Sequence, residues 1–255
     1  MLVAYPHPGS KVEHSFVMSL RAACEFDRNG PHRIDVRQGP WMMRVGTGGL
    51  VDGRNKTIQG WLDGANEEWL MMIDSDMGFA ADAIERLVES AHPVERPIMG
   101  GLCFGLKMTD PDGYGGYLTA PFPTIYVWVN GPDGSHGFKA VTGYPPDQIV
   151  RCSATGAAFL LVHRIAAETV RAKFGDTWFE PVRYPDGRLL SEDLSFCYRL
   201  AQCQIPVHVD TSVKTTHAKT VWVGEREWVA HNMVIEAIAK QQSKAEVPSA
   251  EELEE

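Results

Sequence analysis

The chain has 255 residues, of which 44% are hydrophobic, so it can bury one sizeable core within a single α/β domain. Its formal net charge of −9 gives no attractive field for a nucleic acid. No stretch approaches the roughly eighteen apolar residues of a membrane span, and the N-terminus does not read as a secretory signal. We therefore expect a soluble, cytoplasmic protein with no integral membrane segment and no nucleic-acid partner.

The cysteines point to the same compartment. Their odd number and the absence of a C-x-x-C pair argue against both a disulfide framework and a zinc knuckle. We expect free, mostly buried thiols in a reducing environment. The cysteines are Cys24, Cys103, Cys152, Cys197 and Cys203.

Strands and helices alternate along the first half of the chain. The expected strands are Leu2–Tyr5, His32–Arg37, Leu70–Ile73 and Pro97–Phe104. The expected helices are Ser15–Phe26, a segment from Arg54 to about Asn66, and Phe79–Ser90. This alternation predicts a mostly parallel sheet with helices on both faces, whose ligands gather at the carboxyl ends of the strands.

The second half is less regular. A loop is expected over 107–123, followed by a β-hairpin of Thr124–Val129 and Phe138–Val141. Further expected strands are Ile149–Ser153, Ala157–His163 and Val207–Val209, and further helices are Arg164–Lys173, Ser191–Gln202 and Glu225–Ala239. The acidic residues 241–255 are expected to form a disordered tail.

Two carboxylates, Asp74 and Asp76, follow directly on the apolar run Trp69–Ile73. Two such charges about 5 Å apart repel by roughly 3 kcal/mol at an effective dielectric near 20, which favours a bound divalent ion. Carboxylate oxygens are ligands typical of Mg²⁺ or Mn²⁺. The alternative is that Asp76 caps a helix that begins near Phe79.

Several short segments occur together in a recognisable order. They are Arg54-Asn55, Ile73-Asp74-Ser75-Asp76, Gly100-Gly101, Thr155-Gly156, Ser191-Glu192-Asp193 and Thr216-His217. In this order they resemble the GT-A-fold glycosyltransferases, especially those like family 2, over roughly residues 1–220. Two features depart from that pattern: Tyr5-Pro-His-Pro-Gly9 replaces the usual first loop, and no Gln-x-x-Arg-Trp motif of processive polysaccharide synthases occurs.

The resemblance implies a fold and an activity. The fold is α/β and GT-A-like (Rossmann-like), with a mostly parallel central sheet flanked by helices and a small β-hairpin subregion for the acceptor. One domain would span residues 1–240, with a nucleotide-sugar-binding half at 1–104, an acceptor and catalytic half at 105–224, and a C-terminal helix at 225–240. The enzyme would be a hexosyltransferase that moves a sugar from a nucleoside-diphosphate sugar, expected to be a UDP-sugar, to a hydroxyl of a soluble glycan, protein or small molecule.

The resemblance also implies roles for the acidic residues and one histidine. Asp76 would bind Mn²⁺ or Mg²⁺, Asp74 would hold the ribose or reach the metal through water, and His217 would be a third ligand. A lone histidine is otherwise more often a surface or capped residue. Asp193 would be the base that takes the acceptor's proton, with inversion at the anomeric carbon, while Glu192 would orient the acceptor or the base.

Each of these carboxylates has a structural alternative as well. Ser191 is a plausible N-cap, and a helix N-terminus stabilises a nearby carboxylate, which accounts for Glu192 or Asp193 but not readily for both. Retaining enzymes of the same fold share the metal motif, so the stereochemistry stays open.

The nucleotide is expected to contact several other residues. Arg54 and Asn55 begin the helix after a glycine-rich loop, where they could meet phosphate; the alternative is a surface helix start. Tyr5 and His7 end the first strand, where related enzymes hold the base, although turn packing also explains them. Ser75 lies beside Asp74 and is expected to contact the nucleotide with it.

Four aromatic residues in expected loops are candidates for a sugar pocket, because flat rings pack against sugar C–H groups. They are Tyr114, Tyr117, Trp178 and Phe179. Such rings also commonly pin a loop onto the core. Thr155-Gly156 is expected to allow close backbone approach beside the acceptor, or simply to form a turn.

Two other functions remain open from the sequence. A sugar-phosphate nucleotidyltransferase also uses an α/β sheet and an aspartate-bound metal, but the glycine-rich opening with Arg and Lys that is expected for that class is absent. A non-catalytic nucleotide-sugar-binding protein of the same fold would bind nucleotide without Mn²⁺ and turn over no donor.

Overall fold

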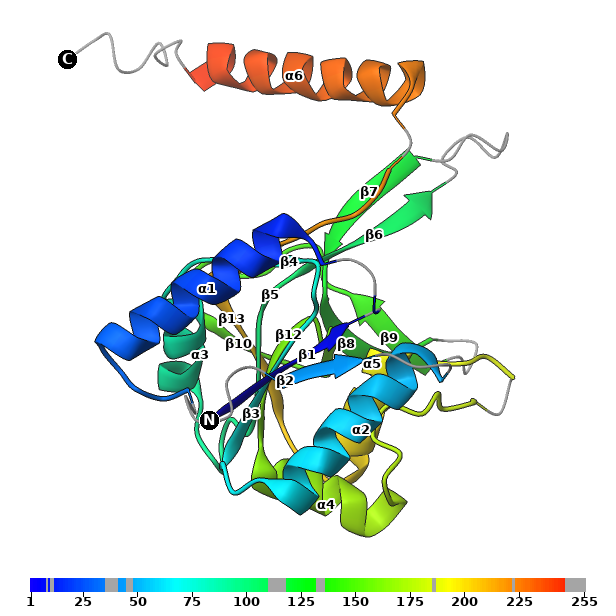
Figure 1. Cartoon of the computed structure of the whole chain (residues 1–255). Helices are drawn as coiled ribbons and strands as arrows, with labels where there is room; N and C mark the ends of the chain where they lie inside the picture. The colour runs from blue at the N-terminus through cyan, green and yellow to red at the C-terminus, as the bar shows by residue number, and fades with distance from the viewer. Residues whose placement is uncertain are drawn as a thin grey trace, which may run out of the picture. The chain divides into compact units, whose positions relative to one another are not determined.

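The computed structural model describes residues 1–7, 9, 12–34, 41–44, 48–109, 118–131, 136–184, 187–221 and 223–245 (Figure 1). The chain divides into two compact units. The larger unit comprises Met1–Gly105 and Pro121–Ala218, and the smaller unit comprises Leu106–Ala120 and Lys219–Glu255. A single domain over residues 1–240 stays a prediction.

An eight-stranded sheet forms the centre of the larger unit, in the order β10-β13-β5-β12-β3-β1-β2, with β4 pairing β13. Its strands are β1 (Leu2–His7), β2 (Trp41–Arg44), β3 (Trp69–Ile73), β4 (Met77–Phe79), β5 (Ile98–Leu102), β10 (Ile149–Cys152), β12 (Phe159–His163) and β13 (Val207–His217). The strands β1, β2, β3, β5 and β13 run in one direction, whereas β12 and β10 run against them. The expected mostly parallel sheet is confirmed.

Helices cover both faces of this sheet (Figure 1). They are α1 (His14–Asn29), α2 (Gly49–Gly64), α3 (Ala83–Ser90), α4 (Arg164–Phe174) and α5 (Glu192–Gln202). One core cluster packs the sheet against α2, α4 and α5, and a second packs it against α1 and α3. Because both faces are covered, every residue of β5 and β12 is buried, as expected for continuous apolar strands in the middle of a sheet.

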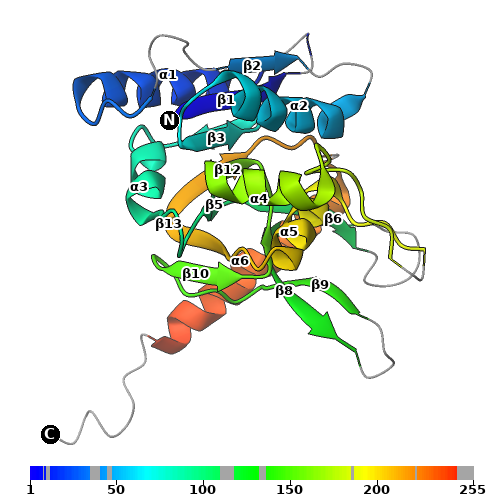
Figure 2. The same cartoon turned by 90° about the horizontal axis from the view of Figure 1, so that it is seen from below.

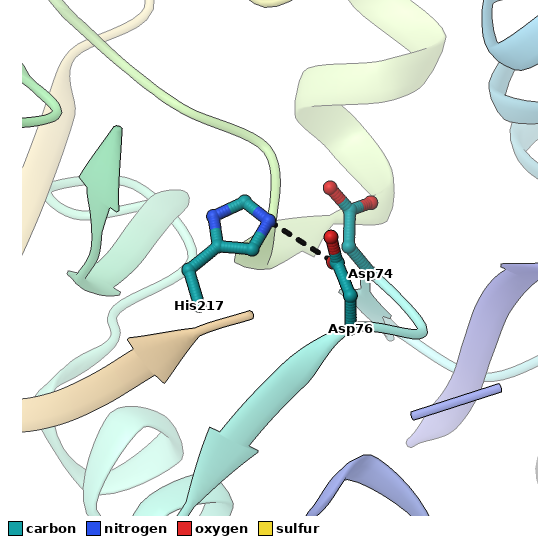
Figure 3. Close-up of side chains that lie close together, drawn as sticks. All are labelled: Asp74, Asp76 and His217. Carbon is teal, nitrogen blue, oxygen red and sulfur yellow. Dashed lines mark ion pairs between the residues drawn. The ribbon is translucent and has the colours of Figure 1, made fainter. Parts of the chain in front are cut away.

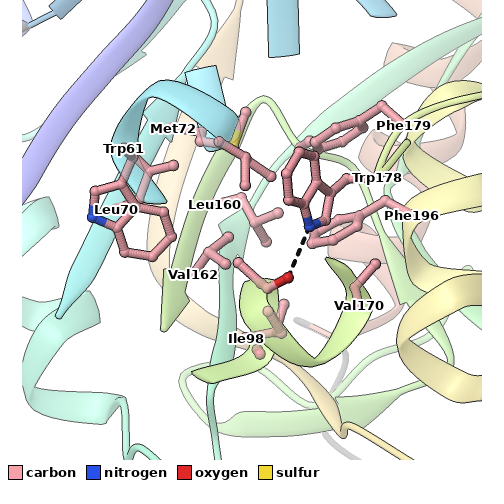
Figure 4. Close-up of a cluster of buried hydrophobic side chains, with 14 of the residues drawn as sticks. Trp61, Leu70, Met72, Ile98, Leu160, Val162, Val170, Trp178, Phe179 and Phe196 are labelled. Carbon is pink, nitrogen blue, oxygen red and sulfur yellow. Dashed lines mark hydrogen bonds between the residues drawn. The ribbon is translucent and has the colours of Figure 1, made fainter. Parts of the chain in front are cut away.

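The core under α2, α4 and α5 contains two aromatic residues that the sequence suggests as ligand contacts. Trp178 and Phe179 have no exposed surface, and the indole Nε1 of Trp178 donates to the carbonyl oxygen of Ala167 at 2.9 Å (Figure 4). Their assignment to a sugar pocket is therefore wrong, and they pin their loop onto the core. Tyr114 and Tyr117 lie outside the described residues.

Three expected boundaries in the first half differ from the structure. Residues 32–34 are not in a strand, residues 35–37 lie outside the described part, and the strand beside β1 is Trp41–Arg44. α2 begins at Gly49, because burial of Ile58 and Trp61 outweighs the roughly 1 kcal/mol that a helical glycine costs. Residues Met77–Phe79 form β4, and the following helix begins only at Ala83.

The expected β-hairpin is confirmed as β8 (Ile125–Asn130) and β9 (His136–Ala140), and β11 (Ala154–Thr155) pairs with β8. The expected loop over 107–123 is only partly correct, because β6 (Phe104–Thr109) and β7 (Leu118–Pro123) pair with each other. Residues 110–117 lie outside the described part.

In the smaller unit, α6 (Glu225–Ala245) confirms the expected C-terminal helix and continues beyond Ala239. Residues 246–255 of the expected tail lie outside the described part. No helix among the described residues is both long enough and apolar enough to cross a bilayer. The five cysteines are free, with Cys103 and Cys197 buried and the others half-buried.

Candidate functional site

Three potential metal ligands converge at one edge of the central sheet (Figure 3). Asp74 follows β3, Asp76 precedes β4, and His217 ends β13. Each offers one ligand atom, and these atoms lie within 4.8 Å of one another. The three side chains therefore come together from two distant parts of the chain, as the family resemblance implies.

Backbone pairing explains why His217 lies beside Asp76. β4 and β13 are antiparallel, with His217 opposite Met77, and the backbone N–H of Ala218 donates to the carbonyl oxygen of Asp76 at 2.9 Å. The imidazole Nε2 of His217 lies 3.0 Å from Oδ1 of Asp76. Because Asp76 leads into a strand and its carboxylate faces His217, the alternative that Asp76 caps a helix is wrong.

The chemistry of these side chains fits a divalent cation. Nδ1 of His217 lies 3.3 Å from the carbonyl oxygen of Phe104, so the tautomer with a proton on Nδ1 can donate to that oxygen. In that tautomer the lone pair of Nε2, the atom that faces Asp76, is available to a metal ion. A lone pair held this way by a hydrogen bond on the far nitrogen is the usual arrangement of a metal-binding histidine.

Arg54 links the candidate metal site to the start of α5. Its Nη2 donates to both carboxylate oxygens of Asp74, at 2.9 and 3.0 Å. Its Nη1 lies 3.3 Å from Oε1 of Glu192 and forms an ion pair with Asp193. The guanidinium also lies 5.4 Å from the ring centroid of Phe179, so a buried aromatic residue supports it from the core side.

Arg54 lies inside α2 rather than at the exposed start of a helix. Because α2 begins at Gly49, Arg54 lies in the second turn rather than at the start of the helix, and it is only 1% exposed. Burial lowers the pKa of its guanidinium, but the carboxylates of Asp193, Asp74 and Glu192 raise that pKa overall. A surface helix start is wrong, while contact between Arg54 and phosphate stays a prediction.

Asp193 occupies the first turn of α5, and Ser191 is at the N-cap position as expected, although its side chain makes no capping hydrogen bond. Its side chain keeps 25% of its surface exposed. Burial raises the pKa of Asp193 to about 6, because the charges of Glu192 and Asp74 add to the effect of burial and outweigh the lowering by Arg54. A carboxylate with such a pKa is ionised at neutral pH yet is a better proton acceptor than an ordinary aspartate.

Gly156 lies between Thr124 and Asp193. A Cβ atom at this position would lie 3.6 Å from Oδ2 of Asp193 and 3.3 Å from Oγ1 of Thr124. Gly156 therefore lies next to the candidate base, while close backbone approach beside an acceptor stays a prediction.

Asn55 has a structural task. Its Oδ1 accepts from the backbone N–H of Phe179 at 2.8 Å, and its Nδ2 donates to Oε1 of Glu180 at 3.2 Å. The side chain is 8% exposed and ties α2 to the loop that carries Trp178. Contact between Asn55 and a nucleotide stays a prediction.

The remaining predicted nucleotide contacts lie at the same edge of the sheet. The ring of Tyr5 packs 5.0 Å from that of Phe16, and Nδ1 of His7 accepts from the backbone N–H of Gly9 at 2.9 Å. The carbonyl oxygen of Ser75 accepts from the backbone N–H of Glu13. All three side chains are half-buried, and their contact with a nucleotide stays a prediction.

One residue near Asp193 was not predicted from the sequence. Tyr126 on β8 has a pKa raised to about 12, by burial first and then by the charges of Asp193 and Cys197. Its phenol therefore keeps its proton at neutral pH and can donate a hydrogen bond near the candidate base. The hairpin pattern locates β8 but carries no signal that this tyrosine lies near α5.

Comparisons with known proteins were made at the level of sequence and of structure. No family model matches the chain, and no curated protein matches it in sequence. Among solved structures, GalNAc-T7 with UDP, GalNAc and Mn²⁺ is similar at a TM-score of 0.50 and 12% identity. The match covers 86% of this chain but 44% of the GalNAc-T7 chain.

Two further structures are similar at lower TM-scores. A197 from STIV gives 0.47 at 12% identity, covering 86% of this chain and 87% of that one. S. aureus TarS 1-349 in complex with UDP-GlcNAc gives 0.45 at 11% identity, covering 88% of this chain and 60% of that one. At such identities a likeness shows the fold alone; the likeness to GalNAc-T7 and the sheet described above confirm the expected GT-A-like fold.

Proposed function

We propose that this chain is a metal-dependent glycosyltransferase that moves a sugar from a nucleoside-diphosphate sugar, in particular a UDP-sugar, to a hydroxyl of a soluble acceptor. The observation that carries the proposal is the convergence of Asp74, Asp76 and His217 within 4.8 Å at the carboxyl edge of the sheet. Ligands of such sheets bind at this edge. A fold neighbour solved with UDP, GalNAc and Mn²⁺ supports the same class of donor and metal.

The proposed donor side of the reaction is the departure of the nucleoside diphosphate. Negative charge builds on the leaving oxygen, and a divalent cation at this site would stabilise it. Asp76 and His217 would hold the cation, and Asp74 would reach it through water or hold the ribose. Since a carboxylate has about four lone-pair positions, Asp74 can serve in this way while it accepts from Arg54.

The proposed acceptor side uses the first turn of α5. Asp193 takes the proton of the acceptor hydroxyl, and attack from the face opposite the leaving group inverts the anomeric centre. Glu192 orients the acceptor or the base. Arg54 is a positioning residue, because one guanidinium contacts both the aspartate beside the metal and the base.

The first test is donor hydrolysis, because many transferases slowly transfer the sugar to water. We expect the purified chain, offered a panel of nucleotide sugars, to release nucleoside diphosphate from one of them with Mn²⁺ and not after EDTA treatment. Asp76→Asn should abolish this release, because one charged ligand is lost, whereas Asp82→Asn at the N-cap of α3 should not.

Other outcomes of the same experiment favour other functions. Release of pyrophosphate from a nucleoside triphosphate and a sugar phosphate would replace the proposal with a nucleotidyltransferase. Nucleotide binding without Mn²⁺, and with no donor turned over, would indicate a non-catalytic binding protein.

A second prediction concerns pH. Asp193 acts as a base only when ionised, and its pKa is raised to about 6. The kcat for transfer should therefore fall about tenfold per unit as pH drops below 6 and level off above it. Nucleotide affinity, measured with Mn²⁺ over the same range, separates this effect from protonation of the metal ligands. A flat kcat between about pH 5 and 7 would contradict the assignment of the base.

A further inference from the structure

A separate pocket of about 420 Å³ lies beside the C-terminal half of α5. Figure 2 shows α5 next to β10 and the β8–β9 hairpin, the elements that form its walls. The lining includes Trp128, Phe138, Arg151, Tyr198 and Ala201, and none of Asp74, Asp76 or His217. Its volume lies in the range of small-molecule sites.

One wall of the pocket is aromatic and held in place by ring contacts. The ring of Trp128 meets that of Phe138 edge to face, with centroids 5.0 Å apart, and lies 6.2 Å from the ring of Tyr198. Such packing fixes the rings before any ligand arrives. Flat apolar faces of this kind suit the C–H groups of a sugar ring.

Part of the pocket lining is polar. Arg151 has no carboxylate partner among the described residues, although the chain carries a net charge of −9. Gln202 and Gln204 add amide groups that can both donate and accept.

The same two elements connect this pocket to the candidate base. Asp193 is in the first turn of α5 and Ala201 is near its end, about 12 Å further along at about 1.5 Å per residue. On β8, Tyr126 lies close enough to Asp193 to be affected by its charge, and Trp128 follows two residues later on the same face of the strand. α5 therefore runs from the candidate base to the pocket.

We propose that this pocket binds a sugar unit of the acceptor, so that the acceptor is a glycan or glycoconjugate whose reacting hydroxyl lies at Asp193. The aromatic wall packs on the sugar ring, and Arg151 with the two glutamines hydrogen-bonds its polar groups. This inference rests on the proposed function, because it assigns the pocket to the acceptor of that reaction.

The test is binding of the labelled, full-length chain to a printed array of oligosaccharides, without a donor. Ala201→Trp fills the pocket from a helix position that accepts a large side chain, and Ala172→Trp on the exposed side of α4 is the matched control. We expect the wild type and Ala172→Trp to bind the same glycans, and Ala201→Trp to bind them at least tenfold more weakly. Arg151→Gln adds no volume and should also weaken glycan binding. It provides the test of the pocket if Ala201→Trp does not fold.

Donor hydrolysis with Mn²⁺, measured on the same wild-type preparation, separates the two proposals. The pocket assignment is overturned, even if donor is hydrolysed, by either of two results. One is an array on which no glycan is bound, and the other is equal binding by wild type, Ala201→Trp and Arg151→Gln. Pocket-dependent glycan binding with no nucleotide sugar turned over overturns the transferase proposal and, with it, the acceptor role.

Discussion

Asp193→Asn is expected to lower the rate of sugar transfer by about 10³-fold or more, while nucleotide affinity in Mn²⁺ stays within about twofold. The amide keeps the shape of the side chain but cannot take a proton from the acceptor hydroxyl. Arg54 still contacts Asp74 and Glu192, so the donor side of the site should hold together.

Glu192→Gln is the matched control, since it removes the same charge from the same turn of α5. It should reduce transfer less than Asp193→Asn does, because its proposed task is orientation. Transfer is followed by release of nucleoside diphosphate and nucleotide affinity by calorimetry, with the anomeric configuration of the product read by NMR. Normal turnover of Asp193→Asn would end the assignment of the base, and a product with retained configuration would end the inverting mechanism.

The sequence was most informative where a pattern is local. The continuous apolar run Trp69–Ile73 correctly predicts a buried strand, and a strand end is where Asp74 and Asp76 must leave the core. His217 is different, because its place beside Asp76 depends on the pairing of β4 with β13. Only the resemblance to a known family suggested it, and no spacing along the chain encodes it.

The errors arose where tertiary packing overrides a local preference. The glycines between residues 46 and 53 predict a loop. Because the apolar face of α2 packs on the core, Gly49–Gly53 are helical instead, and Arg54 lies in the second turn of the helix. Trp178 and Phe179 lie between regular elements and show no periodicity, so the sequence could not separate a core role from a ligand contact. Their burial follows from the arrangement of α2, α4 and α5 around the sheet.

Arg54→Met is expected to lower the free energy of unfolding by about 3 to 5 kcal/mol, because it leaves three carboxylates around a buried site without their cation. In the native protein this guanidinium is 1% exposed and contacts Asp74, Glu192 and Asp193. The loss should also depend on pH. Asp193 already has a pKa of about 6, and removing Arg54 raises that pKa further.

A carboxyl group whose pKa is higher in the folded than in the unfolded chain costs stability as pH rises from its unfolded pKa toward its folded pKa. The deficit of Arg54→Met relative to the wild type should therefore be smaller near pH 5 than near pH 7 and grow as pH rises above 6. Denaturant unfolding at several pH values measures this deficit.

Arg171→Met is the control, because this partly exposed arginine also contacts two aspartates, Asp63 and Asp176, but at the surface. It should cost less than about 1 kcal/mol. Two results would show that the three carboxylates do not depend on Arg54 for their charge balance. One is an equal loss of unfolding free energy in the two variants, and the other is a deficit for Arg54→Met that does not grow with pH.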